Sequence, residues 1–122
     1  MLKRMTKLAY FLIIVIGFSC QKKDGTSTND SITYEVLITV GTWSGGYFDE
    51  TGAPTTVTQQ PSGWTITFIS KQYRPRVLYL YAVANTNGNP PTPKVTLNVY
   101  VNGSLVKSAS DNIGTNLTYN LN

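Results

Sequence analysis

The sequence predicts an all-β fold, a single antiparallel β-sandwich of seven or eight short strands over residues 31–122. Two observations support this class. Apolar residues recur at the two-residue period of a half-buried strand, and no stretch after residue 30 shows a helical period. Clusters of Gly, Pro, Asn and Ser separate these stretches, as turns do between antiparallel strands. An up-and-down barrel is the alternative, because loop lengths do not distinguish the two closures.

The first half of the domain contains four expected strands. Residues 32–40 alternate strictly between apolar and polar side chains, and residues 47–50 form a short strand that runs into a turn at 51–54. Residues 55–60 are polar, which favours an edge strand that needs few apolar side chains. Trp64 opens the fourth strand, in which apolar residues again alternate over 64–69.

The second half begins with residues 77–84, the most apolar run after the leader, which predicts a central strand buried on both faces. Residues 85–94 contain three prolines, which exclude ladder pairing and predict a loop. Residues 95–101 and 104–110 flank Asn102-Gly103, a pair that suits the two positive-φ positions of a type I′ hairpin turn. The chain ends on an expected strand that carries Leu117, Tyr119 and Leu121.

The first 19 residues predict an export signal. Residues 1–7 are basic, and the next eleven residues, 8–18, carry no charge. A membrane-spanning helix needs roughly 20 apolar residues, so this run is typical of a signal peptide instead. Ser19 and Cys20 resemble a bacterial lipobox, although Gly17 and Phe18 depart from its usual pattern. We predict a lipoprotein signal peptide over 1–19 and lipidation of Cys20. The alternative is a general signal peptide followed by a free thiol.

Residues 20–30 predict a lipidated cysteine and a flexible tether. The segment after Cys20 is polar throughout and cannot bury enough apolar surface to order itself. Ten such residues span roughly 17–19 Å, so the domain would stay near the membrane that holds the acyl chains. Gln21, rather than Asp, follows Cys20, which favours the outer membrane of the cell envelope. Which face of that membrane carries the domain is left open.

The charge balance argues against nucleic acid as a partner. The formal net charge of +4 falls to about +1 once the basic residues of the leader are removed, and phosphate binding needs a larger basic surface. Lys71, Arg74 and Arg76 surround Pro75 in the one basic cluster of the domain. This cluster would suit a small anion or a lipid headgroup, but we expect a solvated loop.

The residue types also argue against an enzyme. The chain has no histidine and one cysteine, so nucleophile systems built on histidine and zinc sites built on imidazole or thiolate are excluded. Asp49 and Glu50 would be the best carboxylate pair. Adjacent strand residues point to opposite faces, however, and we expect a solvated turn there. We therefore predict no catalysis, no cofactor and no metal.

Ligand binding is the class of function that the residue types do not argue against. Trp43, Tyr47 and Tyr73 are the candidate ligand-binding residues, as members of a larger set of aromatics that includes Tyr79, Tyr81 and Tyr100. Exposed together, they would form a platform on which a glycan stacks. Buried, they would fill the sandwich, and an apolar patch or open sheet edge elsewhere would favour an interaction module for an envelope protein. Trp43 lies between Gly41 and Gly45, where we expect a loop.

The order of several short motifs resembles the mycobacterial small membrane protein (MmpS) family and the small β-sandwich lipoproteins of Bacteroidota. The motifs are Ile32-Thr33-Tyr34-Glu35-Val36, a Gly-rich stretch before Tyr47, Trp64 at a strand start, Leu80-Tyr81-Ala82 with Asn85, and Val99-Tyr100-Val101-Asn102-Gly103 with Val106-Lys107. The cluster Gln21-Lys22-Lys23-Asp24 after the lipobox also fits Bacteroidota lipoproteins. The MmpS resemblance implies an accessory to a membrane transporter.

Overall fold

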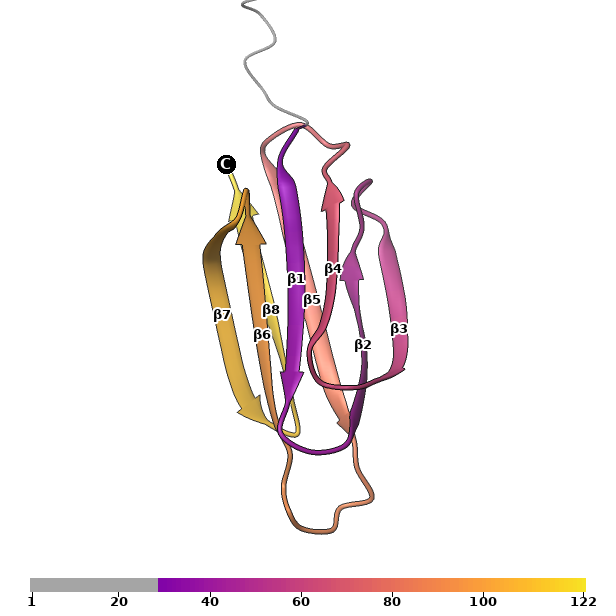
Figure 1. The fold of residues 1–122 in the computed structure, drawn as a ribbon. Helices are drawn as coiled ribbons and strands as arrows, with labels where there is room; N and C mark the ends of the chain where they lie inside the picture. Colours follow the sequence, from indigo (N-terminus) through magenta and orange to yellow (C-terminus); the bar gives the residue numbers. More distant parts are fainter. Residues whose placement is uncertain (1–28) are drawn as a thin grey trace, which may run out of the picture.

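The computed structural model describes residues 29–122, so the expected signal peptide and Cys20 lie outside the described residues. The described part consists of eight strands in two four-stranded antiparallel sheets, β4-β1-β6-β7 and β3-β2-β5-β8 (Figure 1). The strands are β1 (Ser31–Ile38), β2 (Thr42–Phe48), β3 (Pro54–Gln60), β4 (Trp64–Ile69), β5 (Arg76–Asn85), β6 (Lys94–Val101), β7 (Ser104–Asn112) and β8 (Gly114–Leu121). Two separate sheets confirm the predicted β-sandwich and exclude the barrel for this part of the chain.

Consecutive strands run in opposite directions, so the connections gather at two poles (Figure 1). The chain enters β1 at one end, here called the proximal pole, where the β2–β3, β4–β5 and β6–β7 connections and the C-terminus also lie. The β5–β6 loop, residues 86–93, forms the opposite distal pole. No helix within residues 29–122 is long and apolar enough to cross a membrane.

The core lies between the inner faces of the two sheets. In β1 and β6 every second side chain is buried, as the alternation predicts. The buried apolar side chains are Ile32, Tyr34, Val36, Ile38, Trp43, Tyr47, Leu78, Leu80, Ala82, Ala84, Val95, Leu97, Val99, Val101, Leu117 and Leu121. β3 lies at a sheet edge and its seven residues are at most half-buried, which confirms the expected polar edge strand.

The prediction for β5 is wrong in one respect. Only one face of this strand is buried, because no further layer covers the outer side of its sheet in the described part of the chain. Val77 and Val83 are 44% and 48% exposed, and Tyr81 is 37% exposed. β5 is therefore central within its sheet but carries apolar side chains on the molecular surface.

The β6–β7 hairpin confirms the turn chemistry read from the sequence. Asn102 and Gly103 have φ values of 52° and 82°, the positive pair that a type I′ turn requires. The Asn102 side chain also accepts a hydrogen bond from the Ser31 backbone N–H, 2.9 Å away. The hairpin thus contacts the chain at its entry to β1.

Candidate functional site

Trp43 does not lie on an exposed loop, contrary to the sequence-based expectation. It belongs to β2, points between the sheets and is fully buried, and its indole N–H donates to the Pro61 carbonyl at 3.3 Å. Of the two flanking glycines, Gly41 lies in the turn before β2 with φ of +80°, but Gly45 has a packing role, because a Cβ there would overlap the backbone carbonyl of Tyr81 on β5. Gly45 therefore permits close pairing of β2 with β5 instead of marking a turn.

Tyr47 is also a core residue. Its ring packs against three aromatic rings, those of Tyr34, Trp64 and Phe68, with centroids 5.5, 5.7 and 6.5 Å away. Burial raises the pKa of the Tyr47 hydroxyl, because the charged phenolate would be poorly solvated there. Tyr47 is therefore unsuited to a surface platform.

Tyr73 is the one exposed member of the expected trio. It lies on the connection between β4 and β5 at the proximal pole, and 61% of its surface is exposed. Trp43 and Tyr47 are buried in the core, so the structure does not bring the three residues together on one surface. The platform expected from these three residues does not exist.

A different group of aromatic residues reaches the surface. The outer side of the β3-β2-β5-β8 sheet carries Phe48, Tyr79 and Tyr81 in a row, with ring centroids 5.3 Å apart for the first pair and 5.9 Å for the second. We call this surface the outer aromatic face. The spacing of the two tyrosines is the sequence signal for it, since strand residues two apart share a face. The prediction that both faces of β5 are buried places these two tyrosines in the core instead.

Gly46 determines how Tyr81 lies. The two residues are paired across β2 and β5, and a Cβ at Gly46 would come within 2.9 Å of Tyr81 Cε1 and 2.8 Å of the Thr55 carbonyl oxygen. The tyrosine ring therefore extends over the space that a side chain at Gly46 would occupy. The Tyr81 side chain nevertheless stays accessible, since 37% of its surface is exposed.

Two hollows meet at the tyrosine pair. The larger, of about 420 Å³, lies towards β8 and is lined by Tyr79, Tyr81, Val83 and residues 112–116. The smaller, of about 70 Å³, lies towards β3, where Gly46 and Pro54 contribute to its lining. The rings thus form a ridge between two depressions.

Polar, uncharged side chains border this ridge. Asn116 is paired with Tyr81, and Thr118 with Tyr79, so these β8 residues share the outer side of the sheet with the rings. On the other side of the rings, Thr56 of β3 is paired with Gly46, so its side chain also lies on the outer side of the sheet. None of the outward positions on β2, β3, β5 and β8 is Asp, Glu, Lys or Arg. These positions are Thr42, Ser44, Phe48, Pro54, Thr58, Val77, Val83, Asn85, Gly114 and Asn120, together with those named above.

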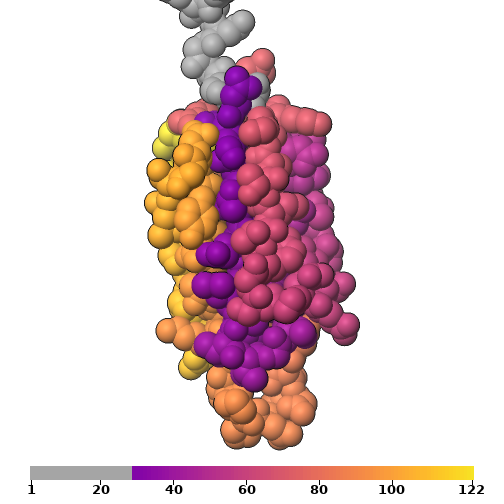
Figure 2. Space-filling view, in the orientation of Figure 1, coloured from indigo at the N-terminus to yellow at the C-terminus, as the bar shows by residue number. Residues whose placement is uncertain are grey.

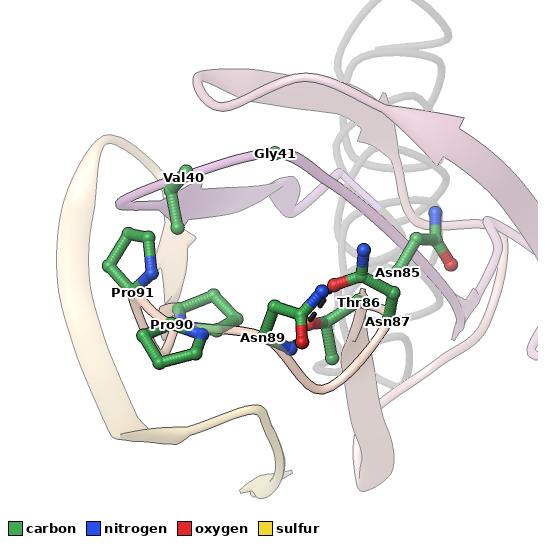
Figure 3. Close-up of a pocket in the computed structure, with 9 residues that line it drawn as sticks. Val40, Gly41, Asn85, Thr86, Asn87, Asn89, Pro90 and Pro91 are labelled. Carbon is green, nitrogen blue, oxygen red and sulfur yellow. Dashed lines mark hydrogen bonds between the residues drawn. The ribbon is translucent and has the colours of Figure 1, made fainter.

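The distal pole contains a further hollow, of about 410 Å³, which Figure 3 shows between Pro90 and Pro91 on one side and Asn85 and Asn87 on the other. The loop itself uses many of its polar groups. Asn87 accepts a hydrogen bond from the Asn89 backbone N–H at 3.1 Å, and the Asn85 amide binds side chains of β2. Because the loop already uses these groups, this hollow is the weaker candidate for ligand binding.

The basic cluster is not the solvated loop that the sequence predicted. Arg74 forms a two-pronged ion pair with Asp30, with N–O distances of 2.6 and 2.8 Å. These hydrogen bonds lower the pKa of the Asp30 carboxyl. Arg76 is buried and donates to Ser70 Oγ and to the carbonyl oxygens of Asp49 and Glu50. Internal oxygens therefore engage both guanidinium groups, which leaves them unsuited to an external anion.

Asp49 acts in the β2–β3 turn. Its carboxylate accepts hydrogen bonds from the Thr51 hydroxyl and backbone N–H and from the Ala53 N–H, at 2.7, 2.9 and 3.0 Å. The Thr51 hydroxyl bond is the main cause of a lowered pKa at Asp49. Within residues 29–122, no three acidic or thiol side chains cluster closely enough to hold a metal ion.

Comparison with known proteins assigns no family to this geometry. No protein-family model matches the chain, and no curated protein matches it. Function is therefore inferred from the sandwich and its outer surfaces.

Proposed function

We propose that this chain is a lipid-anchored, non-catalytic lipoprotein of the cell envelope that acts as an accessory module for an envelope protein. The leader pattern over 1–19 and the single cysteine, Cys20, support the lipid anchor. The lack of histidine, together with a fold built from strand pairing and apolar packing, supports binding rather than catalysis. An accessory role beside a membrane transporter agrees with the family that the sequence resembles.

The entry of the chain into the domain suits a module held by one end. Asp30 immediately precedes β1, and its carboxylate binds Arg74 and Asn102, while its carbonyl accepts the Ser70 N–H at 2.8 Å. The last residue before the sandwich is therefore tied to two connections of the proximal pole. A pull on the tether would act on this cluster rather than on the free end of a strand.

The observation that carries the accessory role is the free edge of β4. This strand pairs with β1 alone, and its six residues contain no charge and no proline. In Figure 2 its residues lie at the surface beside those of β1. Edge strands are ordinarily protected from pairing by charges, prolines or bulges. Of the other three edge strands, β7 has Lys107 and Asp111, and β3 has a register shift where it pairs with β2. β8 also has no charge and no proline, but Lys107 of β7 donates to its Thr118 carbonyl at 2.8 Å.

The register shows which backbone groups of β4 are available to a partner. Ser70 N–H bonds to the Asp30 carbonyl, and these two residues continue the β1–β4 pairing by one step. Hydrogen-bonded and non-bonded pairs alternate along an antiparallel ladder, so the N–H and C=O groups of Thr65, Thr67 and Ile69 point to the free edge. An extended segment of another protein can add there as a fifth strand.

The test of the β4 edge is crosslinking in the native envelope. A photo-crosslinking amino acid in place of Ile69, which is 54% exposed, should capture a discrete envelope protein. Thr65→Pro removes one edge N–H without breaking a bond to β1, and it should abolish capture while leaving the melting temperature nearly unchanged. Thr65→Val keeps the N–H and should retain capture. Capture that persists in Thr65→Pro would rule out strand addition at β4.

The anchor is tested separately. Native cells supplied with a labelled fatty acid should label the wild-type protein and leave Cys20→Ala unlabelled, because acylation requires the thiol. The wild-type protein should also fractionate with the outer membrane. Equal labelling of the two proteins would end the lipoprotein assignment without affecting the test of β4.

A surface carbohydrate-binding lipoprotein is the second candidate. The burial of Trp43 and Tyr47 removes the aromatic platform on which this candidate first depended. The outer aromatic face now favours it on two members of the larger aromatic set, Tyr79 and Tyr81.

A further inference from the structure

We propose that the outer aromatic face is a binding site for a neutral glycan, which stacks on Tyr79 and Tyr81 and forms hydrogen bonds with Asn116 and its neighbours on β8. This site lies on the sheet that does not contain β4. It therefore goes beyond the accessory role at the β4 edge, and the two assignments can fail independently. It gives the carbohydrate-binding candidate a defined site and a class of ligand.

The first step is the presentation of the rings. Tyr81 lies over Gly46, where the missing side chain leaves room for it, and 37% of its surface remains exposed. Tyr79 is next in the row, between Phe48 and Tyr81. The π-face of an aromatic ring is electron-rich. The weakly positive C–H groups on the flat side of a pyranose pack well against such a face.

The second step is the polar border. Asn116 has an amide that both donates and accepts, and the hydroxyl group of Thr118 does the same. Sugar hydroxyls need partners of both kinds. Both residues are paired with the tyrosines across β5 and β8. The hollow of about 420 Å³ that Tyr79, Tyr81 and Asn116 help to line is within the size range of small-molecule sites.

The third step is the absence of charge on this face. The outward positions of its four described strands hold no Asp, Glu, Lys or Arg, so no charged side chain there would select a sulfated, phosphorylated or uronic-acid polymer. One cation, Lys107 of β7, reaches the edge of β8, and its ammonium group is already engaged there because it donates to the Thr118 carbonyl at 2.8 Å. A neutral ligand is therefore the better match.

The direct test uses the full-length, lipid-bearing protein in an amine-oxide detergent, which has no sugar headgroup to compete. Its migration is measured in native gels that contain mixed-linkage β-glucan, dextran or yeast mannan, with alginate as the charged probe. At least one neutral polymer should retard the protein, and alginate should not. Lack of retardation by all three neutral polymers would overturn the proposal, as would retardation by alginate alone.

Variants then assign the binding to this face. Tyr81→Ala and Tyr79→Ala should each weaken retardation at least about tenfold, whereas Tyr81→Phe, which keeps the ring, should bind nearly as the wild type does. Tyr73→Ala removes an exposed tyrosine elsewhere and is the matched control. Melting temperatures identify variants that fail to fold. Asn116→Ala should weaken binding even if a tyrosine variant is unstable.

Two outcomes would overturn the site. Unchanged retardation in folded Tyr79, Tyr81 and Asn116 variants would place the glycan elsewhere. A photo-crosslinker in place of Val83 that captures an envelope protein, in a protein that no neutral polymer retards, would assign the face to a protein partner. Neither result bears on capture from Ile69, so the accessory proposal would stand or fall on its own test.

Discussion

Replacing Trp43 with alanine is expected to destabilise the domain by about 4 kcal/mol. The indole is fully buried, and burial of roughly 200 Å² of aromatic surface contributes about 5 kcal/mol at ~25 cal/mol per Å², of which alanine retains a part. Trp43 also packs edge-on against Trp64 with ring centroids 5.2 Å apart, and it donates to the Pro61 carbonyl. Core truncations of this kind cost about 3–5 kcal/mol. The total free energy of unfolding of a domain of this size is roughly 5–10 kcal/mol, so the variant would lose a large part of its stability.

Urea unfolding of wild type and variant measures this loss. Far-UV circular dichroism follows the sheets, and Trp64 remains as a fluorescent reporter in the variant. Trp43→Phe keeps an aromatic ring but not the indole N–H, and it should lose about 1–2 kcal/mol. Tyr73→Ala, which truncates an exposed aromatic, should change stability by less than about 0.5 kcal/mol. If Trp43→Ala lowers the free energy of unfolding by less than about 1 kcal/mol, Trp43 is not packed in the core, and its placement on an exposed loop would be favoured again.

Three further predictions concern stability. In urea unfolding, Gly45→Ala should lower the free energy of unfolding by more than about 3 kcal/mol, because the new Cβ would meet backbone atoms of β5. Gly63→Ala should lower it by only about 1–2 kcal/mol, since the space around that Cβ is open and the cost comes from the φ of +86°. Equal losses in the two variants would contradict this. The pKa of Asp30 is lowered in the folded domain, so its ion pair with Arg74 stabilises the fold at any pH above 3.8, the ordinary pKa of the carboxyl. At pH 7 the melting temperature of Asp30→Asn should therefore lie below that of the wild type. The two should converge well below pH 3.8, and a gap that persists in acid would be inconsistent with the ion pair. Burial raises the pKa of Tyr34 to about 12, so its contribution to stability is complete below pH 10 and is lost as the pH rises towards 12. Ultraviolet titration should detect a component that ionises near pH 12 and is absent from Tyr34→Phe, and identical titration curves would argue against that shift.

The elements predicted well from sequence are those whose signal is local. Strict alternation in β1 and β6, the polar character of β3 and the Asn102-Gly103 turn all depend on residues within a few positions of one another. The interpretation of Trp43 failed because a glycine can mark either a turn or a close approach of two strands. Only the position of Tyr81, remote along the chain but adjacent in the sheet, distinguishes these two roles for Gly45.

The candidate sites needed information that no local pattern contains. An apolar run such as β5 has the same appearance whether one or two layers cover it, and Tyr81 became a surface residue because nothing covers its sheet from outside in the described part. The edge status of β4 likewise depends on which strand pairs with β1 on the other side. Arg76 could be buried because Ser70 and the carbonyl of Asp49 meet its guanidinium group from separate connections.

The sequence alone determined the all-strand class, the strand periods, the hairpin turn and the lack of histidine chemistry, because composition and alternation are properties of neighbouring residues. Tertiary structure alone decided which aromatic side chains are buried, which sheet edge is open and where the arginines find their partners. Each of these depends on contacts between segments far apart in the chain. Both proposed binding surfaces, the β4 edge and the outer aromatic face, belong to this second group.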